Sequence, residues 1–419
     1  MGHKMTKTSF LTATAACAAL AATAAATAQT RGAAKSGPAT YWMSAETTSG
    51  LAAMNAGGGQ QAGRPSLLGA ISGRGAAPSA GHVRSLTLQL GSPRSAAGAP
   101  SAEHLPPSGL GAGPSLPLLS PERASAPVPP PHYNPAQASG AQGRILIYWG
   151  CGDRVRPGQP FEIDLARLSA GQVPPGMAQL AMQAMSPPNA AASTTYGEWP
   201  NERSRAQIPA QASLVGAHTI RGNYTPEINF TLADGQDFLA PVRLTSNSAA
   251  AGGAVPVAWQ NVPRARAWFM TATGAASDRD IVIWTSSEIQ FTQMAAYDYI
   301  GEGEIARLLQ QRILLPGATT QCTIPAEVVN RMQGSGSLML NAFGPEANFS
   351  APRPAGAARS WRPDWTVKLR TRSVYMGMVG QDLEAMMRGE TREQRPDRPQ
   401  REERRRRNPL NPLGRIFGG

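Results

Sequence analysis

Apolar and polar residues alternate in three short runs in the middle of the chain. In the first run, Val255, Val257 and Trp259 fall on one face of an extended segment, because side chains point to opposite sides in turn along a strand. The second run, around Trp268, repeats the alternation. The third, residues 281–284, is apolar throughout, as expected of a strand that is covered on both faces. The pattern predicts three consecutive strands joined by short turns.

Three tryptophans, Trp259, Trp268 and Trp284, lie on these runs. A fully buried Trp removes about 150–250 Å² of surface from water. At about 25 cal/mol per Å², each indole contributes on the order of 4–6 kcal/mol as an upper bound. We therefore expect the three indoles to share a dry core between two layers of extended chain.

The turn between the first two runs carries a recognisable arrangement of residues. Trp259, the pair at 262–263 (Val-Pro), Ala265 and Trp268 resemble the signature that joins the B and C strands of fibronectin type III modules. Arg264 stands where that family usually has Gly, and Trp268 stands where it usually has Tyr.

This resemblance covers residues 255–289 and implies an immunoglobulin-like β-sandwich. Such sandwiches carry many different functions, and the family has no catalytic residues to transfer to this chain. An unrelated antiparallel hairpin is the alternative explanation of the same pattern.

Short alternating runs bounded by turn residues occur along much of the chain. They predict further strands over residues 41–43, 86–90, 145–149, 161–165, 214–220, 227–232, 238–244, 337–343 and 365–374. Many short strands at turn-separated intervals are typical of all-β packing. We therefore predict an all-β fold with one or two immunoglobulin- or fibronectin-like β-sandwiches.

Residues 302–315 are the convincing helical segment. Ile305, Leu308 and Ile313 recur at helical spacing, and Pro316 ends the segment. A second, shorter helix is predicted immediately after Thr323-Ile324, over residues 325–332. We expect the longer helix to be an insertion that caps an open end of the sandwich core.

Composition adds irregular segments to this picture. Of the 419 residues, 44 are Gly and 37 are Pro, which argues for long disordered stretches. The resulting division is a signal peptide (1–28), a Gly/Ala/Pro-rich segment with isolated strands (29–140), a β-rich domain (141–245), a fibronectin type III-like β-sandwich with a helical insertion (246–380) and a basic disordered tail (381–419).

The first 28 residues have the pattern of a secretory signal. Lys4 and Lys7 precede a weakly apolar stretch, and small residues before Gln29 favour cleavage after Ala28. A lipoprotein signal ending at Cys17 is the alternative. The sequence therefore predicts a periplasmic or secreted protein, and no other window has the length and apolarity of a transmembrane span.

Cys151 and Cys322 are the cysteines that remain after such cleavage. Two buried thiols in an oxidising compartment often pair, so we predict a disulfide between them. Two free cysteines with a redox role are the alternative, although their spacing lacks a Cys-x-x-Cys motif. The glycines that flank Cys151 predict a sharp turn there.

The net charge of +12 is partly concentrated at the C-terminus. Residues 388–419 contain ten Arg against five acidic residues, and few apolar residues are present to fold them. The run Arg404, Arg405, Arg406 and Arg407 is a candidate for contact with an anionic surface such as lipid or lipopolysaccharide. A solvated tail without a specific ligand is the alternative, and export disfavours nucleic acid as a partner.

No motif for catalysis or metal binding is present. The histidines at 82, 104, 132 and 218 lack zinc-site spacing, and neither a Gly-x-Ser-x-Gly elbow nor a P-loop occurs. The acidic residues near turns, which lack EF-hand spacing and are expected to be solvated, are Asp234, Asp237, Asp278, Asp280 and Glu288. We assign no catalytic, metal-binding or cofactor-binding residue and expect no cofactor.

These observations favour an exported, envelope-associated, non-enzymatic binding or scaffolding protein of unknown ligand. A secreted hydrolase, and a carbohydrate-binding or adhesion module, remain as alternatives in which a site lies on loops between strands. The protein partner is unknown.

Overall fold

The computed structural model describes residues 37–56, 81–121, 142–175, 185–291, 298–334 and 336–381, which all belong to one unit, Met1–Leu383. Of these residues 41% are in strands and 9% in helices, which confirms the all-β class. The predicted signal peptide, residues 122–140 of the predicted Gly/Ala/Pro-rich segment and the tail with Arg404, Arg405, Arg406 and Arg407 lie outside the described residues.

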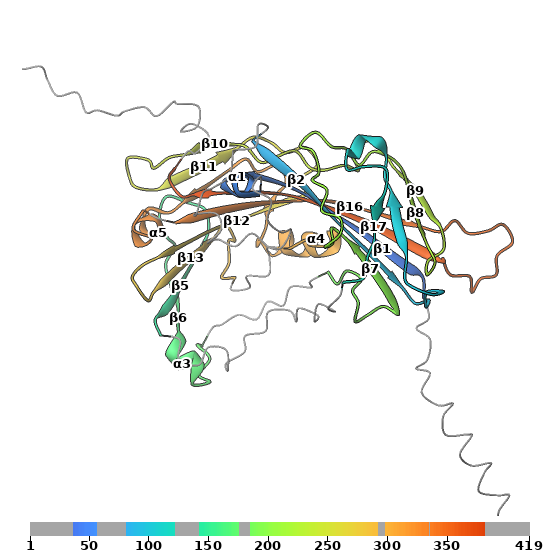
Figure 1. The fold of residues 1–419 in the computed structure, drawn as a ribbon. Coiled ribbons are helices and arrows are strands. Elements are labelled where there is room, and N and C mark those ends of the chain that lie inside the picture. The colour runs from blue at the N-terminus through green and yellow to red at the C-terminus, as the bar shows by residue number, and fades with distance from the viewer. Residues whose placement is uncertain are drawn as a thin grey trace, which may run out of the picture. The chain divides into compact units, whose positions relative to one another are not determined.

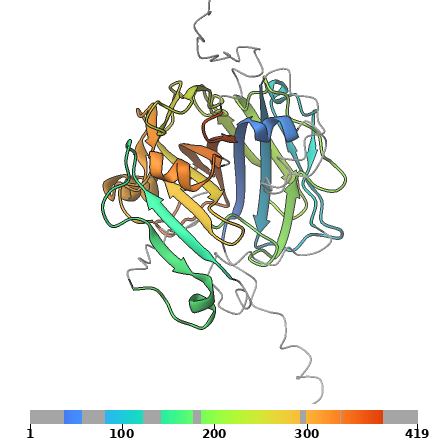
Figure 2. The same ribbon diagram turned by 90° about the vertical axis from the view of Figure 1, so that its left-hand side faces the viewer.

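The largest sheet has ten strands (Figures 1 and 2). Its order is β6 (Phe161–Asp164), β5 (Arg144–Trp149), β13 (Ile281–Thr285), β12 (Ala267–Ala275), β16 (Ser337–Ser350), β17 (Trp365–Met378), β1 (Ala39–Gly50), β2 (His82–Ser92) and β7 (Thr195–Trp199), with β14 (Leu315–Pro316) paired to β12. Neighbours run antiparallel, except that β5 is parallel to β13 and β1 is parallel to β17.

Two smaller antiparallel sheets pack on one face of this sheet, here called the inner face (Figure 1). The first contains β10 (Leu244–Asn247), β11 (Val255–Trp259) and β15 (Gln321–Ile324). The second contains β4 (Leu116–Pro117), β3 (Ala102–Leu105), β8 (Gly216–Gly222) and β9 (Ile228–Leu232). Each smaller sheet encloses its own hydrophobic core against the large one.

The two cores share the long strand β17. Val367 and Leu369, in its first half, pack against the four-stranded sheet, whereas Tyr375, in its second half, packs against the three-stranded sheet. In Figure 2, the blue β1, the paler β2 and the green β7 continue the sheet beyond β17. Strands from segments 29–140, 141–245 and 246–380 thus pair within a single sheet.

All three tryptophans of the predicted core are buried beneath the three-stranded sheet. Trp259, Trp268 and Trp284 are 2%, 0% and 0% exposed and belong to one cluster. The ring centroids of Trp259 and Trp268 lie 5.2 Å apart. The Nε1 atom of Trp268 donates to the Gly317 carbonyl and that of Trp284 to the Gly150 carbonyl, each at 3.0 Å. Burial and hydrogen bonding together fix the layers around these rings.

The prediction of a strand over residues 238–244 is wrong. The chain there crosses the inner face between the two cores, and only Leu244 belongs to a strand, β10. Thr47 Oγ1 donates to the Leu239 carbonyl and Ser49 Oγ to the Val242 carbonyl, both at 2.7 Å. Because side-chain hydroxyls satisfy these backbone groups, the segment stays extended without a neighbouring strand.

The helix predicted over residues 302–315 is shorter and lies elsewhere than expected. The helix α4 (Glu302–Gln310) ends where Arg312 takes a left-handed φ of 57°. Its Ile305 and Leu308 pack with Phe269 and Phe343. These phenylalanines alternate with inner-face residues along β12 and β16, so α4 covers the outer face of the sheet and does not cap the end of a core.

The other helices are short. They are α1 (Leu51–Ala56), η1 (Ser108–Leu110), α3 (Leu165–Ser169) and α5 (Ala326–Arg331). The last agrees with the helix predicted over residues 325–332. Residue 165, predicted to end a strand, instead begins α3, because the Asp164 side chain accepts a hydrogen bond from the backbone N–H of Arg167 and caps the helix.

Candidate functional site

The predicted disulfide between Cys151 and Cys322 is confirmed. Cys151 follows β5 in the ten-stranded sheet, whereas Cys322 lies in β15 of the three-stranded sheet, and their Cα atoms are 5.2 Å apart. The backbone N–H of Gly152 also donates to the Thr323 carbonyl at 3.0 Å. The bond therefore ties together the two layers that enclose the tryptophans. Gly150, with a φ of 97°, makes the sharp turn that the sequence predicted there.

A group of charged and aromatic side chains lies on the outer face of β1 and β17, and we call it the cation–aromatic stack. It alternates in the order Lys368, Trp42, Arg370, Tyr299 and Arg372. Lys368 Nζ lies 5.5 Å from the Trp42 ring centroid, and the guanidinium carbon of Arg370 lies 5.2 Å from the same centroid. The guanidinium carbons of Arg370 and Arg372 lie 4.3 and 4.6 Å from the Tyr299 centroid. Each cation faces the electron-rich surface of a ring.

The three cations of the stack differ in their partners. Arg372 pairs with Glu46 at 2.5 Å, and Lys368 pairs with Glu346 at 2.5 Å. Among the described residues, Arg370 forms no ion pair with a carboxylate: its Nε donates to Ser44 Oγ at 2.7 Å, and its buried Nη1 has no hydrogen-bond partner there. Burial lowers the pKa of Arg370. The Trp42 and Tyr299 rings lie against this buried charge, and the charges of Asp298 and Glu346 also favour it.

The stack fixes the segment that contains Tyr299 against the sheet. Burial raises the pKa of the Tyr299 phenol, so the ring stays neutral beside the two guanidiniums. Because cations already lie over both Trp42 and Tyr299, the stack is better suited to hold this segment than to offer a bare ring to a ligand. Lys368, Arg370 and Arg372 stand at every second position of the sequence, and this spacing is the signal that would have placed the cations on one face.

A second polar group surrounds a hollow of about 410 Å³, which we call the seam hollow. It lies among the start of β2, the loop after β7, the crossing segment 238–243 and the turn between β11 and β12. Its polar lining consists of His82, Arg84, Gln211, Arg243, Gln260 and Asn261, and the remaining lining residues are Ala and Pro. None of its described lining residues carries a carboxylate.

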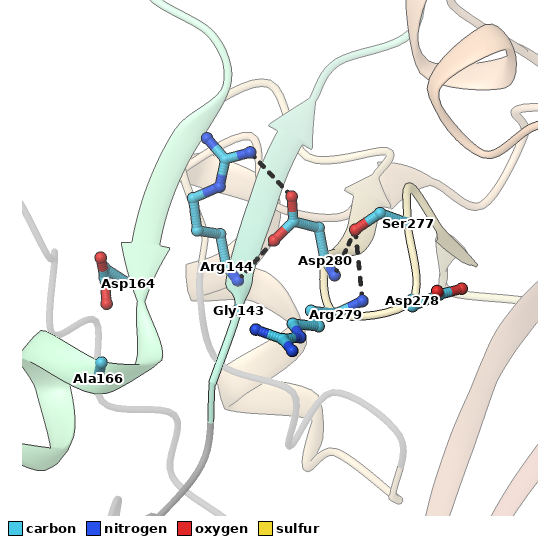
Figure 3. Close-up of a pocket in the computed structure, with 8 residues that line it drawn as sticks. All are labelled: Gly143, Arg144, Asp164, Ala166, Ser277, Asp278, Arg279 and Asp280. Atoms are coloured by element: carbon cyan, nitrogen blue, oxygen red, sulfur yellow. Dashed lines mark hydrogen bonds and ion pairs between the residues drawn. The ribbon is translucent and has the colours of Figure 1, made fainter.

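Another hollow, of about 550 Å³, opens at the edge of β5 and β13 (Figure 3). Arg144 Nη2 donates to Asp280 Oδ2 at 2.8 Å, and the Arg144 backbone N–H donates to Oδ1 at 2.9 Å. The hydrogen bond from Arg144 lowers the pKa of the Asp280 carboxyl. Ser277 Oγ accepts from the backbone of Asp280 at 3.0 Å. These bonds lock the turn before β13, so the side chains serve the turn itself.

The acidic residues that the sequence placed at turns do not converge. Asp237 accepts bonds from Ser213 Oγ at 2.6 Å and from the backbone of Leu214 and Phe238, each at 2.8 Å. Within the described ranges, no group of three or more His, Cys, Asp or Glu is arranged to hold a metal ion.

Sequence analysis missed a buried pair of histidines in the core under the four-stranded sheet. His104 Nε2 lies 2.8 Å from His218 Nδ1, and His218 Nε2 lies 2.7 Å from the Leu214 carbonyl. The carbonyl only accepts, so a neutral His218 carries its proton on Nε2 and accepts from His104 Nε2–H at Nδ1. Their positions 114 residues apart left no local signal.

This pair predicts acid sensitivity. Burial is the largest cause that lowers the pKa of His104, and the charge of His218 lowers it further. Burial also lowers the pKa of His218. Below about pH 6.5 these two imidazoles bind protons in the unfolded chain but stay neutral in the folded chain. The free energy of unfolding should therefore decrease as the pH falls below 6.5. Urea denaturation at pH 7.5, 6.0 and 5.0 measures this decline.

The double variant His104→Phe and His218→Phe is the control for that decline. Its stability should change less between pH 7.5 and 5.0, because the remaining carboxylates titrate mostly at lower pH. An equally steep decline in the variant would show that other groups cause it.

Among the described residues, no helix is both long and apolar enough to pass through a bilayer. No protein-family model, no curated protein and no solved structure matches the chain.

Proposed function

We propose that this chain is an exported, envelope-associated, non-enzymatic protein that binds or scaffolds other components outside the cytoplasm. The observation that carries the proposal is the disulfide between Cys151 and Cys322, which joins two layers of the fold. Disulfides that hold a structure together form and persist in oxidising compartments and are rare in the cytosol. The signal-like pattern of residues 1–28 supports the same location.

We further propose that the part from β10 to β17 is a fibronectin type III-like sandwich. The strands β10, β11 and β15 pair in one sheet, and β13, β12, β16 and β17 pair in the other, all antiparallel. In chain order they correspond to strands A, B, C, C′, E, F and G of an immunoglobulin-like sandwich. Arg264, which replaces the family's glycine, has the positive φ of 72° that glycine would favour.

The sandwich assignment supports a role in binding or spacing. Modules of this kind present loops and sheet faces to partners while a rigid core holds them. Here the large sheet extends beyond both edge strands of the proposed module, through β5 and β6 on one side and β1, β2 and β7 on the other. The added strands give the module a second core and two further surfaces.

The basic tail is the proposed attachment to anionic envelope components. The run Arg404, Arg405, Arg406 and Arg407 would contact phosphates of lipid or lipopolysaccharide through charge. Each basic residue near an anionic membrane contributes about 1 kcal/mol, and salt screens this attraction.

Fractionation of cells that produce the full chain tests this attachment. We expect the protein in the envelope fraction at low salt and in the soluble extracytoplasmic fraction after a high-salt wash. Replacing Arg404, Arg405, Arg406 and Arg407 together by Gln should move most of the protein to the soluble fraction at low salt.

A second variant, with Gln in place of the exposed arginines Arg154, Arg221, Arg266 and Arg312, is the matched control for lost charge. Envelope association that depends equally on both sets would contradict a specific role for the tail. Recovery of the wild-type chain in the cytoplasm, with residues 1–28 retained, would overturn export itself.

A further inference from the structure

We infer that the seam hollow is a binding site for a small polyhydroxylated anion, such as a sugar acid or a sugar phosphate. The inference goes beyond the proposed function, since it concerns the ligand chemistry of one hollow and does not depend on export or on the tail. The shared chemistry of these ligands is one oxyanion and several hydroxyl groups.

The hollow collects donors of the kind that an oxyanion needs. Arg84 and Arg243 bring two guanidiniums to one lining, and a guanidinium binds carboxylate or phosphate through paired N–H groups. Arg243 is exposed, and its side chain makes no hydrogen bond or ion pair with any other described residue. Its charge is therefore available to a ligand.

Arg84 is held in place from behind. Its Nη1 donates to the Ala212 carbonyl, and its guanidinium carbon lies 5.1 Å from the centre of the Phe238 ring. Its Nε is buried without a hydrogen-bond partner. Partial burial lowers the pKa of Arg84, so an anion bound in the hollow would favour its charged form.

The carboxylate that acts on Arg84 is not part of the lining of the hollow. Asp237 raises the pKa of Arg84 through its charge, and its two oxygens accept bonds from Ser213, Leu214 and Phe238. Asp237 does not line the hollow. The lining itself carries two full positive charges and no negative one, so its field favours an anion.

The rest of the lining suits hydroxyl groups. Gln211, Gln260 and Asn261 each offer an amide that both donates and accepts, and all three are exposed. His82 lies beside them, with Nε2 3.1 Å from the Ala210 carbonyl. The volume of about 410 Å³ falls in the range of roughly 300–1,000 Å³ that small-molecule sites occupy.

The walls of the hollow are fixed before any ligand arrives. Thr47 and Ser49 hold the crossing segment 238–243 through its carbonyls. The backbone N–H of Gln260 donates to the Arg243 carbonyl at 2.9 Å, and Arg264 Nη2 donates to the Phe238 carbonyl at 2.8 Å. A preformed site loses less conformational entropy on binding.

Isothermal titration of the full chain at low salt tests the inference with four probes: glucuronate, glucose 6-phosphate, glucose and inorganic phosphate. We expect glucuronate, glucose 6-phosphate or both to bind at least tenfold more tightly than glucose. The two anionic sugars distinguish a carboxylate from a phosphate ligand. Inorganic phosphate should bind more weakly than the preferred sugar, because it lacks the hydroxyl groups that the amides would contact.

Arg243→Ala locates the site. This exposed side chain packs in no described hydrophobic cluster, so the variant should fold, and it should weaken binding of the preferred sugar at least tenfold. Arg221 is also exposed but lies on β8, away from the lining of the hollow, so Arg221→Ala should leave the affinity unchanged. Because both variants retain the basic tail, nonspecific binding to that tail is the same in each comparison.

Arg84→Lys is the second variant, since it keeps the charge and loses the planar fork; we expect it to lower the affinity while circular dichroism shows an intact fold. Three results would overturn the inference: no binding of either anionic sugar at millimolar concentration, equal binding of glucose, or equal affinity in Arg243→Ala and the wild type.

Discussion

Replacing Cys151 and Cys322 together by alanine lowers the free energy of unfolding by about 3–5 kcal/mol. The bond joins two cysteines that are 171 positions apart, and a cross-link over so long a loop removes much conformational entropy from the unfolded chain. Alanine is the chosen replacement because Cys322 is 3% exposed, and a serine hydroxyl there would need a buried partner. Urea denaturation monitored by tryptophan fluorescence measures the change.

Reduction of the wild-type chain is the matched control for this variant. It should lower the stability by a similar amount without changing any side chain, whereas reducing agent should leave the alanine variant unaffected. If two thiols react in the denatured, unreduced wild-type protein, the disulfide does not form in solution and the predicted loss would have another cause.

The alternation of apolar and polar residues predicted the strands around the three tryptophans correctly. The runs around Trp259, Trp268 and Trp284 are strands, and their indoles meet in one core. Residues 238–244 show the limit of this reasoning: their apolar pattern is that of a strand, but hydroxyls from Thr47 and Ser49 bind their carbonyls. Each of these two bonds joins residues about 190 positions apart. The local sequence therefore could not show whether this extended segment pairs with a strand or with side chains.

The same limit applies to the pairing of strands. β1 is parallel to β17 at the other end of the described chain, and β5 is parallel to β13. No local feature of residues 39–50 indicates that β1 pairs with β17 on one side and with β2 on the other. The Gly/Ala/Pro-rich composition of the first part predicted isolated strands there, and it did not indicate that β1 and β2 lie within the large sheet.

Candidate sites were harder to predict than strands, because each gathers residues from distant segments. The cation–aromatic stack combines β1, β17 and Tyr299, and the seam hollow combines four segments between His82 and Asn261. Only the disulfide was predictable, since the chain offers a single pair of cysteines after the expected cleavage. In that case the number of cysteines was enough to predict the pair, without knowledge of where they lie in the fold.

Trp284→Ala should destabilise the fold by about 3–5 kcal/mol, because it opens a cavity in a core where the indole is fully buried. Comparison of two milder variants separates the hydrogen bond of this indole from its volume. Trp284→Phe removes the Nε1 donor, so the carbonyl of Gly150, the residue before Cys151, loses this hydrogen bond. Trp259→Phe removes an Nε1 that is buried without any hydrogen-bond partner.

Both phenylalanine variants lose a similar part of an indole ring from the same core, so the difference between them reports mainly the hydrogen bond. We expect Trp284→Phe to cost about 1–3 kcal/mol more than Trp259→Phe, which is the penalty for an unpaired buried polar group. Urea denaturation of both variants gives this difference, and near-ultraviolet circular dichroism checks that each native core remains packed. Equal losses would mean that the Gly150 carbonyl finds another donor, in which case the turn before Cys151 is not held by Trp284.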